Sequence, residues 1–254
     1  MIQLIPQGGL GNQLFQIAAG YSLALDNGEE FSICGDDHHL PFQGLAITNY
    51  KNNILRNFRF SEMDDSLAMY RYLDSKYAPI PHSKNVRIMG YFQSEKYFSN
   101  NKDEIIKALA PEKSTTDYID SKYSITEDSA SIHIRRGDYL KLSHVHPVMS
   151  DKYYHKAINM LGGVDNIFIF SDDLEWCKAN ISHEKSIFVD EDDYICIHMM
   201  SQCGANIGGN SSFGWWGAYL NQRPEKIAIF PSNWFGNKQF SEYKDIFMDH
   251  FVLL

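Results

Sequence analysis

Hydrophobic residues recur along the first half of the chain with two different spacings, and each spacing predicts a different element. The apolar run at residues 2–5 has the length of a short buried strand, whereas apolar positions every three or four residues across 13–25 indicate a helix. Asn12 is the predicted N-cap of that helix, and residues 26–28 end it. The same spacings predict strands at 30–34 and 86–89 and helices at 64–73 and 101–109.

The second half of the chain alternates regularly between apolar runs and helical patterns. The expected strands are 131–134, 166–170, 186–189, 205–208 and 227–230, and the expected helices are 151–161, 174–179, 194–202 and 212–220. Such alternation is typical of parallel strands joined by helices in a doubly wound α/β sheet. A polar stretch at 112–129 precedes it, so we expect two domains, residues 1–125 and 126–254.

Composition limits the classes of function. The chain has 254 residues, 44% of them hydrophobic and 22% charged, which suits an ordinary globular protein with a sizeable core. Its formal net charge of -9 argues against broad nucleic-acid binding, which needs a basic surface, but it allows a local cationic pocket. The four cysteines form no CxxC pair, and we find no signal peptide and no apolar run of membrane-spanning length. We therefore expect a reducing, cytoplasmic location and no integral membrane segment.

A glycine-rich turn, "GGLGNQ" at residues 8–13, lies between the first predicted strand and its helix. It lacks the third glycine of a dinucleotide fingerprint and the Gly-Lys-Ser/Thr of a P-loop. A strand, a glycine turn and a helix N-terminus together still favour an anion, because backbone N–H groups and the helix dipole point outward there. A tight turn that serves packing alone is the alternative.

The stretch "SIHIRRGDY" places two arginines at the end of a predicted strand. His133 and Arg135 are two residues apart and share one face. Arginine suits phosphate because its planar fork donates two parallel hydrogen bonds. We predict a socket for a phosphate-bearing substrate here. A surface ion pair between Arg136 and Asp138 is the alternative.

Two further stretches follow later strands. In "NIGGNSSFGWW", Ser211 and Ser212 either cap a helix or bind phosphate oxygens, and the tryptophans are expected to pack the helix against the sheet. The acidic stretch at 190–193 contains an Asp-x-Asp, which could hold a divalent metal. We favour a solvated loop and expect no metal site, because two arginines are available to neutralise a diphosphate.

Four stretches in order, "GGLGNQLFQ", "HIRRGDY", "FSDDLEW" and "NSSFGWWGAYLN", resemble the α-1,2-fucosyltransferase family. The resemblance implies two Rossmann-like domains in a GT-B-like arrangement with the active site in the interdomain cleft. It also implies transfer of fucose from GDP-fucose to a galactoside hydroxyl with inversion, without a metal or other cofactor. The first domain would be the acceptor side, and the second would bind the nucleotide sugar.

The resemblance also assigns roles to individual residues. Arg135 would bind the β-phosphate with support from Arg136, and Asp138 would orient both. The other implied donor-binding residues are His133, Ser211, Ser212 and Phe213 in the second domain and Gly9, Gly11 and Asn12 in the first.

Cys196 departs from the family pattern, since related enzymes carry an Asp near this position that binds the guanine edge. Asp193 or Asp192 could supply that carboxylate instead. The general base stays open among Asp138, His144 and His146. A nucleotide-sugar-binding protein without turnover, a transferase with another donor and an NAD-type oxidoreductase stay open as other functions, the last disfavoured by the missing glycine. The expected partners are the donor and a glycan acceptor, with peripheral association with a lipid-linked acceptor left open.

Overall fold

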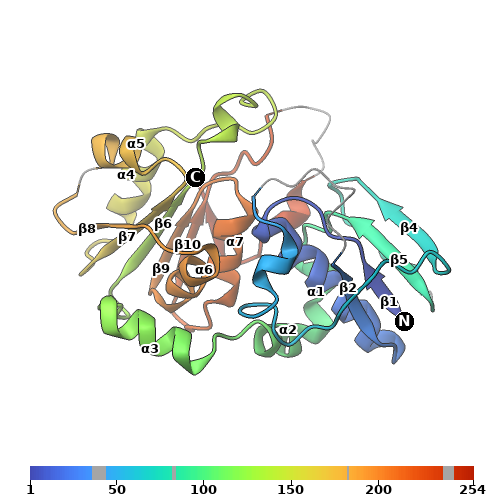
Figure 1. Ribbon diagram of the computed structural model, residues 1–254. Helices are drawn as coiled ribbons and strands as arrows, with labels where there is room; N and C mark the ends of the chain where they lie inside the picture. Colours follow the sequence, from blue (N-terminus) through green and yellow to red (C-terminus); the bar gives the residue numbers. More distant parts are fainter. Residues whose placement is uncertain (36–43, 82–83, 182, 237–242) are drawn as a thin grey trace. The chain divides into compact units, whose positions relative to one another are not determined.

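The computed structural model describes residues 1–35, 44–81, 84–181, 183–236 and 243–254, which form two compact units (Figure 1). The first comprises Met1–Glu112 with Glu242–Met248, and the second comprises Lys113–Ser241 with Asp249–Leu254. The division follows residue 112 rather than residue 125, because the polar stretch contains helix α3 (Lys113–Lys122), which is anchored on the second unit through Glu191.

A parallel five-stranded sheet forms the centre of the first unit. Its strands, in spatial order, are β3 (Phe60–Ser61), β2 (Phe31–Cys34), β1 (Ile2–Leu4), β5 (Val86–Gly90) and β4 (Ala68–Tyr72). Helix α1 (Leu10–Asn27) packs against β1 and β2. The smaller helical elements are η1 (Ile47–Tyr50), η2 (Glu95–Tyr97), η3 (Ser99–Asn101), α2 (Lys102–Ala108) and η6 (Lys244–Ile246).

Two expectations for this unit are wrong. Gly9, not Asn12, is the N-cap of α1, because the Gly9 carbonyl already accepts the N–H groups of Asn12 and Gln13 at 2.9 and 3.0 Å. The helix expected at 64–73 is instead strand β4, which pairs with β5 along its whole length. Its tyrosines alternate with exposed residues, and this period of two suits a half-buried edge strand.

A parallel six-stranded sheet forms the centre of the second unit. Its strands, in spatial order, are β11 (Phe251–Leu253), β10 (Ile227–Phe230), β9 (Ala205–Gly208), β6 (Ala130–Ile134), β7 (Ile167–Ser171) and β8 (Ser186–Val189). The helical elements after α3 are η4 (Asp138–Leu140), α4 (Asp151–Met160), α5 (Leu174–Asn180), α6 (Asp193–Gln202) and α7 (Ser212–Leu220). The alternation predicted here is confirmed nearly residue for residue, and β11 is an additional edge strand.

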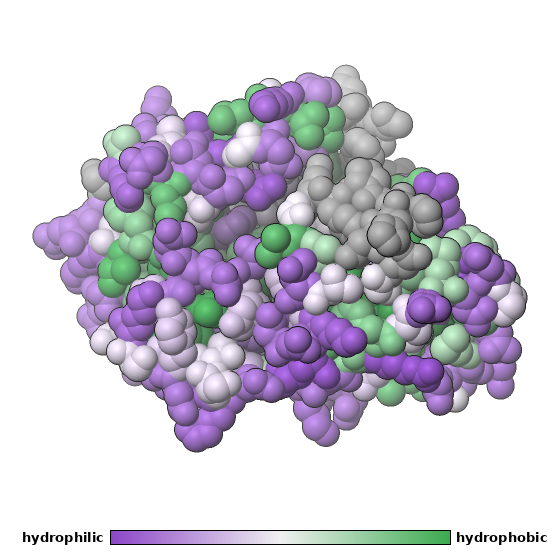
Figure 2. Space-filling view, in the orientation of Figure 1, coloured by the Kyte–Doolittle hydropathy of each residue, from purple (hydrophilic) through white to green (hydrophobic). Residues whose placement is uncertain are grey.

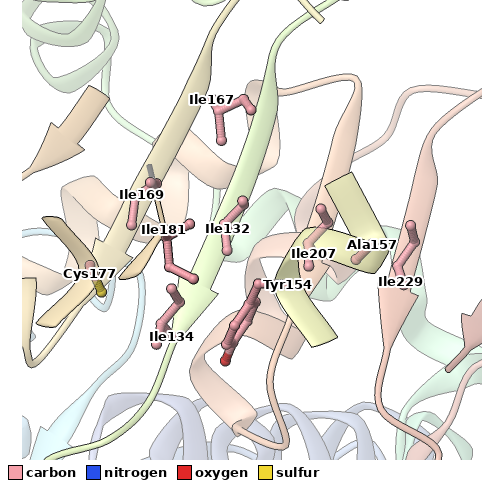
Figure 3. Close-up of a cluster of buried hydrophobic side chains, with 10 residues drawn as sticks. All are labelled: Ile132, Ile134, Tyr154, Ala157, Ile167, Ile169, Cys177, Ile181, Ile207 and Ile229. Carbon is pink, nitrogen blue, oxygen red and sulfur yellow. The ribbon is translucent and has the colours of Figure 1, made fainter. Parts of the chain in front are cut away.

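Alternate residues of β6 point to opposite faces of this sheet, and the two faces have different roles. Ile132 and Ile134 belong to a buried cluster to which α4 contributes Tyr154 and α5 contributes Cys177 (Figure 3). His133 lies on the other face, where its ring is 5.1 Å from that of Phe213 at the start of α7. An aliphatic core on one face thus fixes the strand that presents His133 on the other.

Both sheets reverse their strand order at one point, and the predicted motifs lie there. In the second sheet, β7 and β8 extend from one side of β6, whereas β9 pairs with its other side. In the first sheet, β1 lies between β2 and β5. Ligands of open α/β sheets bind at such switch points, beyond the carboxyl ends of the strands. The arginine motif and the "GGNSS" loop follow β6 and β9, and the glycine turn follows β1.

Hydrophilic residues cover most of the face drawn in Figure 2, and apolar residues on it form small separate groups, as expected of a surface exposed to water. Among the described residues, none of the helices is long and apolar enough to cross a membrane.

Candidate functional site

Arg135 is the first residue after β6, and two carboxylates hold its guanidinium. Its Nε and Nη2 lie 2.9 and 2.8 Å from Asp138 Oδ1, and Nη1 lies 3.1 Å from Asp172 Oδ2. About one third of the Arg135 side chain is exposed (33%). The fork is therefore oriented by partners but still accessible to an anion from solvent.

Arg136 has a different environment although it is the next residue. Its guanidinium lies 3.8 Å from the centroid of the Trp176 ring and pairs with Asp173 at 3.1 Å, and only 13% of its side chain is exposed. Its backbone N–H donates to Asp172 Oδ1 at 2.8 Å. Arg136 thus ties the end of β6 to α5, and the surface pair considered between Arg136 and Asp138 is formed by Arg135 instead.

Gly137 permits this arrangement. A Cβ at this position would lie 2.6 Å from Asp172 Oδ2, so a side chain would displace the carboxylate that binds both arginines.

The His133 ring packs beneath the first turn of α7. A Cβ on Gly214 would lie 3.0 Å from His133 Nδ1, so the helix approaches the ring as closely as only glycine allows. Burial, followed by the nearby charge of Arg135, lowers the pKa of His133 to about 3. The imidazole is therefore neutral, and within the described part of the chain its buried Nδ1 has no hydrogen-bond partner.

The N-cap residue of α7 makes no side-chain capping hydrogen bond within the described part of the chain. Ser211 occupies the N-cap position in an extended conformation, but its hydroxyl accepts no backbone N–H. The first turn of a helix presents N–H groups that lack intrahelical partners, together with the positive end of the helix dipole. This turn, with Ser211, Ser212 and Phe213, lies beside His133 and forms a site suited to an anion.

The glycine turn of the first unit is held by two glutamines. Gln13 Nε2 donates to the Gly8 carbonyl at 2.8 Å, and the Gln16 amide exchanges two hydrogen bonds with the backbone of Gln7. Gly8 has a φ of 75°, and a Cβ there would lie 2.8 Å from Asn12 Nδ2. Gly9 and Gly11 follow at the start of α1, and the N-cap Gly9 has no side chain with which to cap the helix.

Gln93, three residues after the end of the neighbouring strand β5, joins this turn. Its Nε2 donates to Asn12 Oδ1 at 2.7 Å. The preceding residue, Phe92, has a φ of 49°, a conformation uncommon for a bulky side chain and found most often at functional sites. Sequence reasoning missed Gln93, because the strand pairing that brings it beside Asn12 joins residues far apart in the chain.

A cavity of about 620 Å³ lies at the carboxyl end of β8, within the second unit. Its lining residues are Ser114, Thr115, Tyr118, Asp190, Glu191, Asp192, Tyr194 and Ile195. Glu191 is only 8% exposed and accepts hydrogen bonds from Tyr118, Lys122 and Tyr123. The acidic stretch is therefore partly a structural anchor for α3 and partly the wall of a cavity. Among the described residues, no group of His, Cys, Asp and Glu is arranged to hold a metal ion.

Cys196 is buried in the first turn of α6, close to this cavity. Its Sγ donates to the Glu191 carbonyl at 3.4 Å, and burial raises the pKa of the thiol to about 12. Cys196 therefore remains a neutral thiol that is turned back to its own helix start. Asp193, the first residue of α6, is half-buried and lies beside the cavity-lining residues.

The second unit thus brings together seven of the predicted residues: His133, Arg135, Arg136 and Asp138 at the end of β6, and Ser211, Ser212 and Phe213 at the start of α7. Asp193 lies at the same sheet edge beyond β8, and Gly9, Gly11 and Asn12 lie in the first unit. Asp172, Asp173, Trp176 and Tyr139 also belong to the arginine cluster, although sequence reasoning did not assign them roles. The stretch "FSDDLEW" could have indicated Asp172, Asp173 and Trp176, since it lies at the carboxyl end of β7, the strand next to β6.

Comparison with known proteins finds glycosyltransferases of similar sequence. The chain is 30% identical to an α-1,2-colitosyltransferase of Escherichia coli, covering 93% of each chain. It is 29% identical to the O-antigen biosynthesis glycosyltransferase WbnK of Escherichia coli, covering 91% of this chain and 94% of the relative. It is 26% identical to galactoside α-(1,2)-fucosyltransferase 2 of Pongo pygmaeus, covering 84% of this chain and 67% of the relative.

Solved structures share the fold. NodZ α-1,6-fucosyltransferase, co-crystallised with GDP, superposes with a TM-score of 0.51 at 12% identity over 86% of this chain and 92% of that one. POFUT1 in complex with GDP-fucose superposes with a TM-score of 0.50 at 12% identity, over 90% of this chain and 96% of that one. Together with the two parallel sheets, these structures confirm the expected fold class of two Rossmann-like domains.

The sequence model of glycosyl transferase family 11 matches residues 1–254, the whole chain. The chain therefore belongs to glycosyl transferase family 11 and is a glycosyltransferase.

Proposed function

We propose that this chain transfers fucose from GDP-fucose to hydroxyl 2 of a galactoside, with inversion at the anomeric carbon. Membership of family 11 supports a sugar transfer, and the α-1,2 linkage is named for both a bacterial and a mammalian relative. The relatives differ in the sugar, since one is a colitosyltransferase. Donor identity is therefore the part of this proposal that needs the sharpest test.

The observation that carries the proposal is the Arg135 fork beside the start of α7. Both lie at the carboxyl ends of β6 and β9, where the strand order reverses. A guanidinium and helix N–H groups are both suited to a diphosphate, and together they supply donors from two directions. The neutral His133, on β6 against the first turn of α7, adds a polar group without adding charge.

The residues take the following roles in this proposal. Arg135 stabilises the leaving diphosphate, Asp138 orients its fork, and Arg136 supports the loop from the Trp176 side. His133, Ser211, Ser212 and Phe213 bind the donor. Gly9, Gly11 and Asn12 approach the donor from the first unit, across the cleft that the family fold implies.

The cavity at β8 is our candidate for the nucleotide base. It lies two strands from β6, which corresponds to about 10 Å across a parallel sheet. Guanine presents adjacent N–H donors, and carboxylates are their best acceptors. Asp193, next to the cavity wall, is the carboxylate that we assign to this role in place of the neutral Cys196 thiol.

The reaction is a single displacement. The acceptor oxygen attacks the anomeric carbon as GDP leaves, and negative charge grows on the diphosphate. Preorganised donors that bind this charge lower the barrier, and loss of one such donor commonly costs about 10²–10³ in rate. Because Arg135 and the α7 turn can supply this stabilisation, we propose that no divalent metal is required.

We further propose that the protein is cytoplasmic and meets a glycan acceptor there, with peripheral association if that acceptor is lipid-linked. Cys177, Cys196 and Cys203 are buried thiols that form no disulfide among the described residues, which suits a reducing compartment.

The test is a transfer assay with GDP-fucose, GDP-mannose and UDP-galactose as donors and a β-galactoside as acceptor. We expect product from GDP-fucose alone, with an α-1,2 linkage identified by NMR. Stabilisation by GDP without product or hydrolysis would favour a binding protein. Product from a different donor would overturn the donor assignment while leaving the transferase class intact.

A further inference from the structure

Three planar groups stack in a row beside the proposed phosphate site. The Arg135 guanidinium lies 5.8 Å from the centroid of the Tyr139 ring, and the Tyr139 ring stacks on the His146 imidazole at 4.5 Å and 13°. Phe235 closes the row, with its centroid 5.6 Å from that of His146. The side chain of His146 is therefore held in a fixed orientation close to Arg135.

Asn210 fastens both walls of this row. Its carbonyl accepts the hydroxyl of Tyr139 at 3.1 Å, and its side-chain amide donates to the Trp234 carbonyl at 2.9 Å, one residue before Phe235. Asn210 directly precedes Ser211, the N-cap of α7. The imidazole is thus positioned by the same loop that presents the anion-binding turn.

One nitrogen of His146 is open to a ligand. Within the described residues, the buried Nδ1 has no hydrogen-bond partner, and no hydrogen bond to a side chain or backbone group engages Nε2. The residue as a whole is half-buried, so Nε2 is the nitrogen that a bound molecule can reach.

The distance between Arg135 and His146 suits a role for the imidazole at the acceptor hydroxyl. The guanidinium of Arg135 and the imidazole are at most about 10 Å apart, given the separations of 5.8 and 4.5 Å across Tyr139. A phosphate held by an arginine has its phosphorus about 4 Å from the guanidinium carbon. The attacking oxygen lies about 3–3.5 Å from the anomeric carbon, and its base about 3 Å farther. Together with the phosphorus–oxygen–carbon bridge between them, these steps form a bent path, so a base on the order of 10 Å from the guanidinium lies within its reach.

The carboxylates of the cluster are already engaged. Asp138 and Asp172 pair with Arg135, and Asp173 pairs with Arg136 while capping α5. Proton acceptance by any of them would break an ion pair that orients an arginine. His133 is almost fully buried, and its pKa of about 3 makes it too weak a base.

We propose that His146 is the general base of the reaction, a role that rests on the proposed fucosyl transfer. The acceptor hydroxyl gives its proton to Nε2 as its oxygen forms a bond to the anomeric carbon. The bond from that carbon to the phosphate oxygen breaks, and the electron pair leaves with GDP. The imidazolium then releases the proton to solvent.

The surroundings of His146 keep it neutral at physiological pH. Burial lowers its pKa, Asp138 raises it, and Arg135 and His144 lower it further. The net direction is downward, so the free base is present at pH 7 and is lost as the pH falls below the ordinary histidine range of about 6.5. We therefore expect the transfer rate of the wild-type protein to fall with pH below that range, which gives the pH profile an acid limb.

The experiment measures kcat, KM for both substrates and GDP affinity in His146→Asn and His146→Gln, with the exposed His183→Asn, in the loop between α5 and β8, as control. We expect kcat to fall about 10²–10⁴-fold in both His146 variants, as for loss of a general base. GDP affinity and donor KM should stay within about twofold, because the base contacts neither the nucleotide nor its phosphates. The acid limb of the pH profile should disappear, and the control should match wild type.

Two results would overturn the proposal. One is a kcat within about fivefold of wild type with the acid limb retained. The other is a parallel loss of GDP affinity and kcat in both variants, which would indicate a structural role. A wild-type chain that binds GDP but transfers nothing would instead overturn the proposed function, and the role of His146 with it.

Discussion

Two adjacent arginines at the end of β6 have different physical roles. Arg135 is one third exposed and keeps its fork at an accessible edge, whereas Arg136 is mostly buried on the Trp176 ring. Stacking and ion pairing fix Arg136 within the unit. Loss of Arg135 should therefore affect catalysis, whereas loss of Arg136 should first affect the stability of the loop.

Replacement of Arg135 tests the first role. We expect Arg135→Ala to lower kcat/KM about 10²–10³-fold, because one preorganised donor to the leaving group is lost. Arg135→Lys should be similarly impaired, since lysine keeps the charge but lacks the planar fork. Steady-state kinetics on the folded variants give the answer, with the exposed Arg59→Lys as control. Near-normal turnover in Arg135→Ala would refute the assignment.

Replacement of Asp193 tests guanine recognition. A hydrogen bond to a charged group contributes roughly 1.5–3 kcal/mol, so Asp193→Asn should weaken GDP binding about tenfold to a hundredfold in calorimetry. Asp165→Asn, exposed and not among the residues that line the cavity, is the matched control. Cys196→Ser should change little, because the thiol already donates to the Glu191 carbonyl. Tighter binding in Cys196→Asp, with Asp193→Asn unaffected, would show that the guanine carboxylate belongs at position 196.

At the scale of elements, α7 and β6 pack so closely that their contact needs a glycine. A Cβ on Gly214 would lie 3.0 and 3.1 Å from His133 Nδ1 and Cβ, and the strand that carries His133 is fixed from behind by the isoleucine cluster. Neither partner has room to move, so the start of α7 must shift if the glycine is replaced.

Gly214→Ala is therefore expected to be destabilising and to weaken nucleotide binding together. Overpacking of this kind costs about 1–3 kcal/mol. Urea unfolding and GDP calorimetry measure the two effects. Gly163→Ala is the matched control, because a Cβ there meets nothing within 4 Å. Unchanged GDP affinity in Gly214→Ala would mean that the first turn of α7 does not bind the diphosphate.

The anchoring of α3 on the β8–α6 loop depends on one carboxylate. Burial raises the pKa of Glu191, but hydrogen bonds from Lys122, Tyr123 and Tyr118 outweigh it, and the net pKa is lowered. A carboxylate with a lowered pKa stabilises the folded state above its unfolded pKa of about 4.3, and this contribution is lost as the pH falls through the folded value.

Glu191→Gln should therefore lower the urea midpoint at pH 7, and the difference from wild type should shrink as the pH approaches 4 and below. Glu175→Gln, whose side chain is 87% exposed, should show no difference at either pH. A Glu191→Gln deficit that is independent of pH would mean that shape, not charge, holds α3 in place.

At the scale of the whole molecule, each sheet carries a predicted motif at its own switch point. The second sheet places the arginine cluster and the α7 turn together, and the first sheet places the glycine turn beside Gln93. The cationic and N–H donors of these turns are the molecule's means of stabilising a diphosphate, although the chain as a whole carries a net charge of -9.

Activity is accordingly expected to survive exhaustive chelation. The protein is dialysed against EDTA, and transfer is then measured with and without added Mn²⁺ or Mg²⁺. We expect chelation to change the transfer rate only slightly, because Arg135 and the helix N–H groups stabilise the charge that grows on the leaving diphosphate. Complete loss that Mn²⁺ or Mg²⁺ restores would show that the acidic loop at residues 190–193 holds a metal.

The sequence by itself determined the elements and the motifs of this protein. Periodicity is a local property, so it was sufficient for the strands and helices of the second unit other than α3 and β11, and the order of four motifs was sufficient for the family. It was not sufficient for β4, because pairing with β5 selected a strand where the local pattern also allowed a helix. Only the tertiary structure decided which arginine is accessible, that Asp172 and Tyr139 join the cluster, and that His146 stacks beside Arg135. These contacts join residues brought together by strand order and loop packing, and no local spacing encodes them.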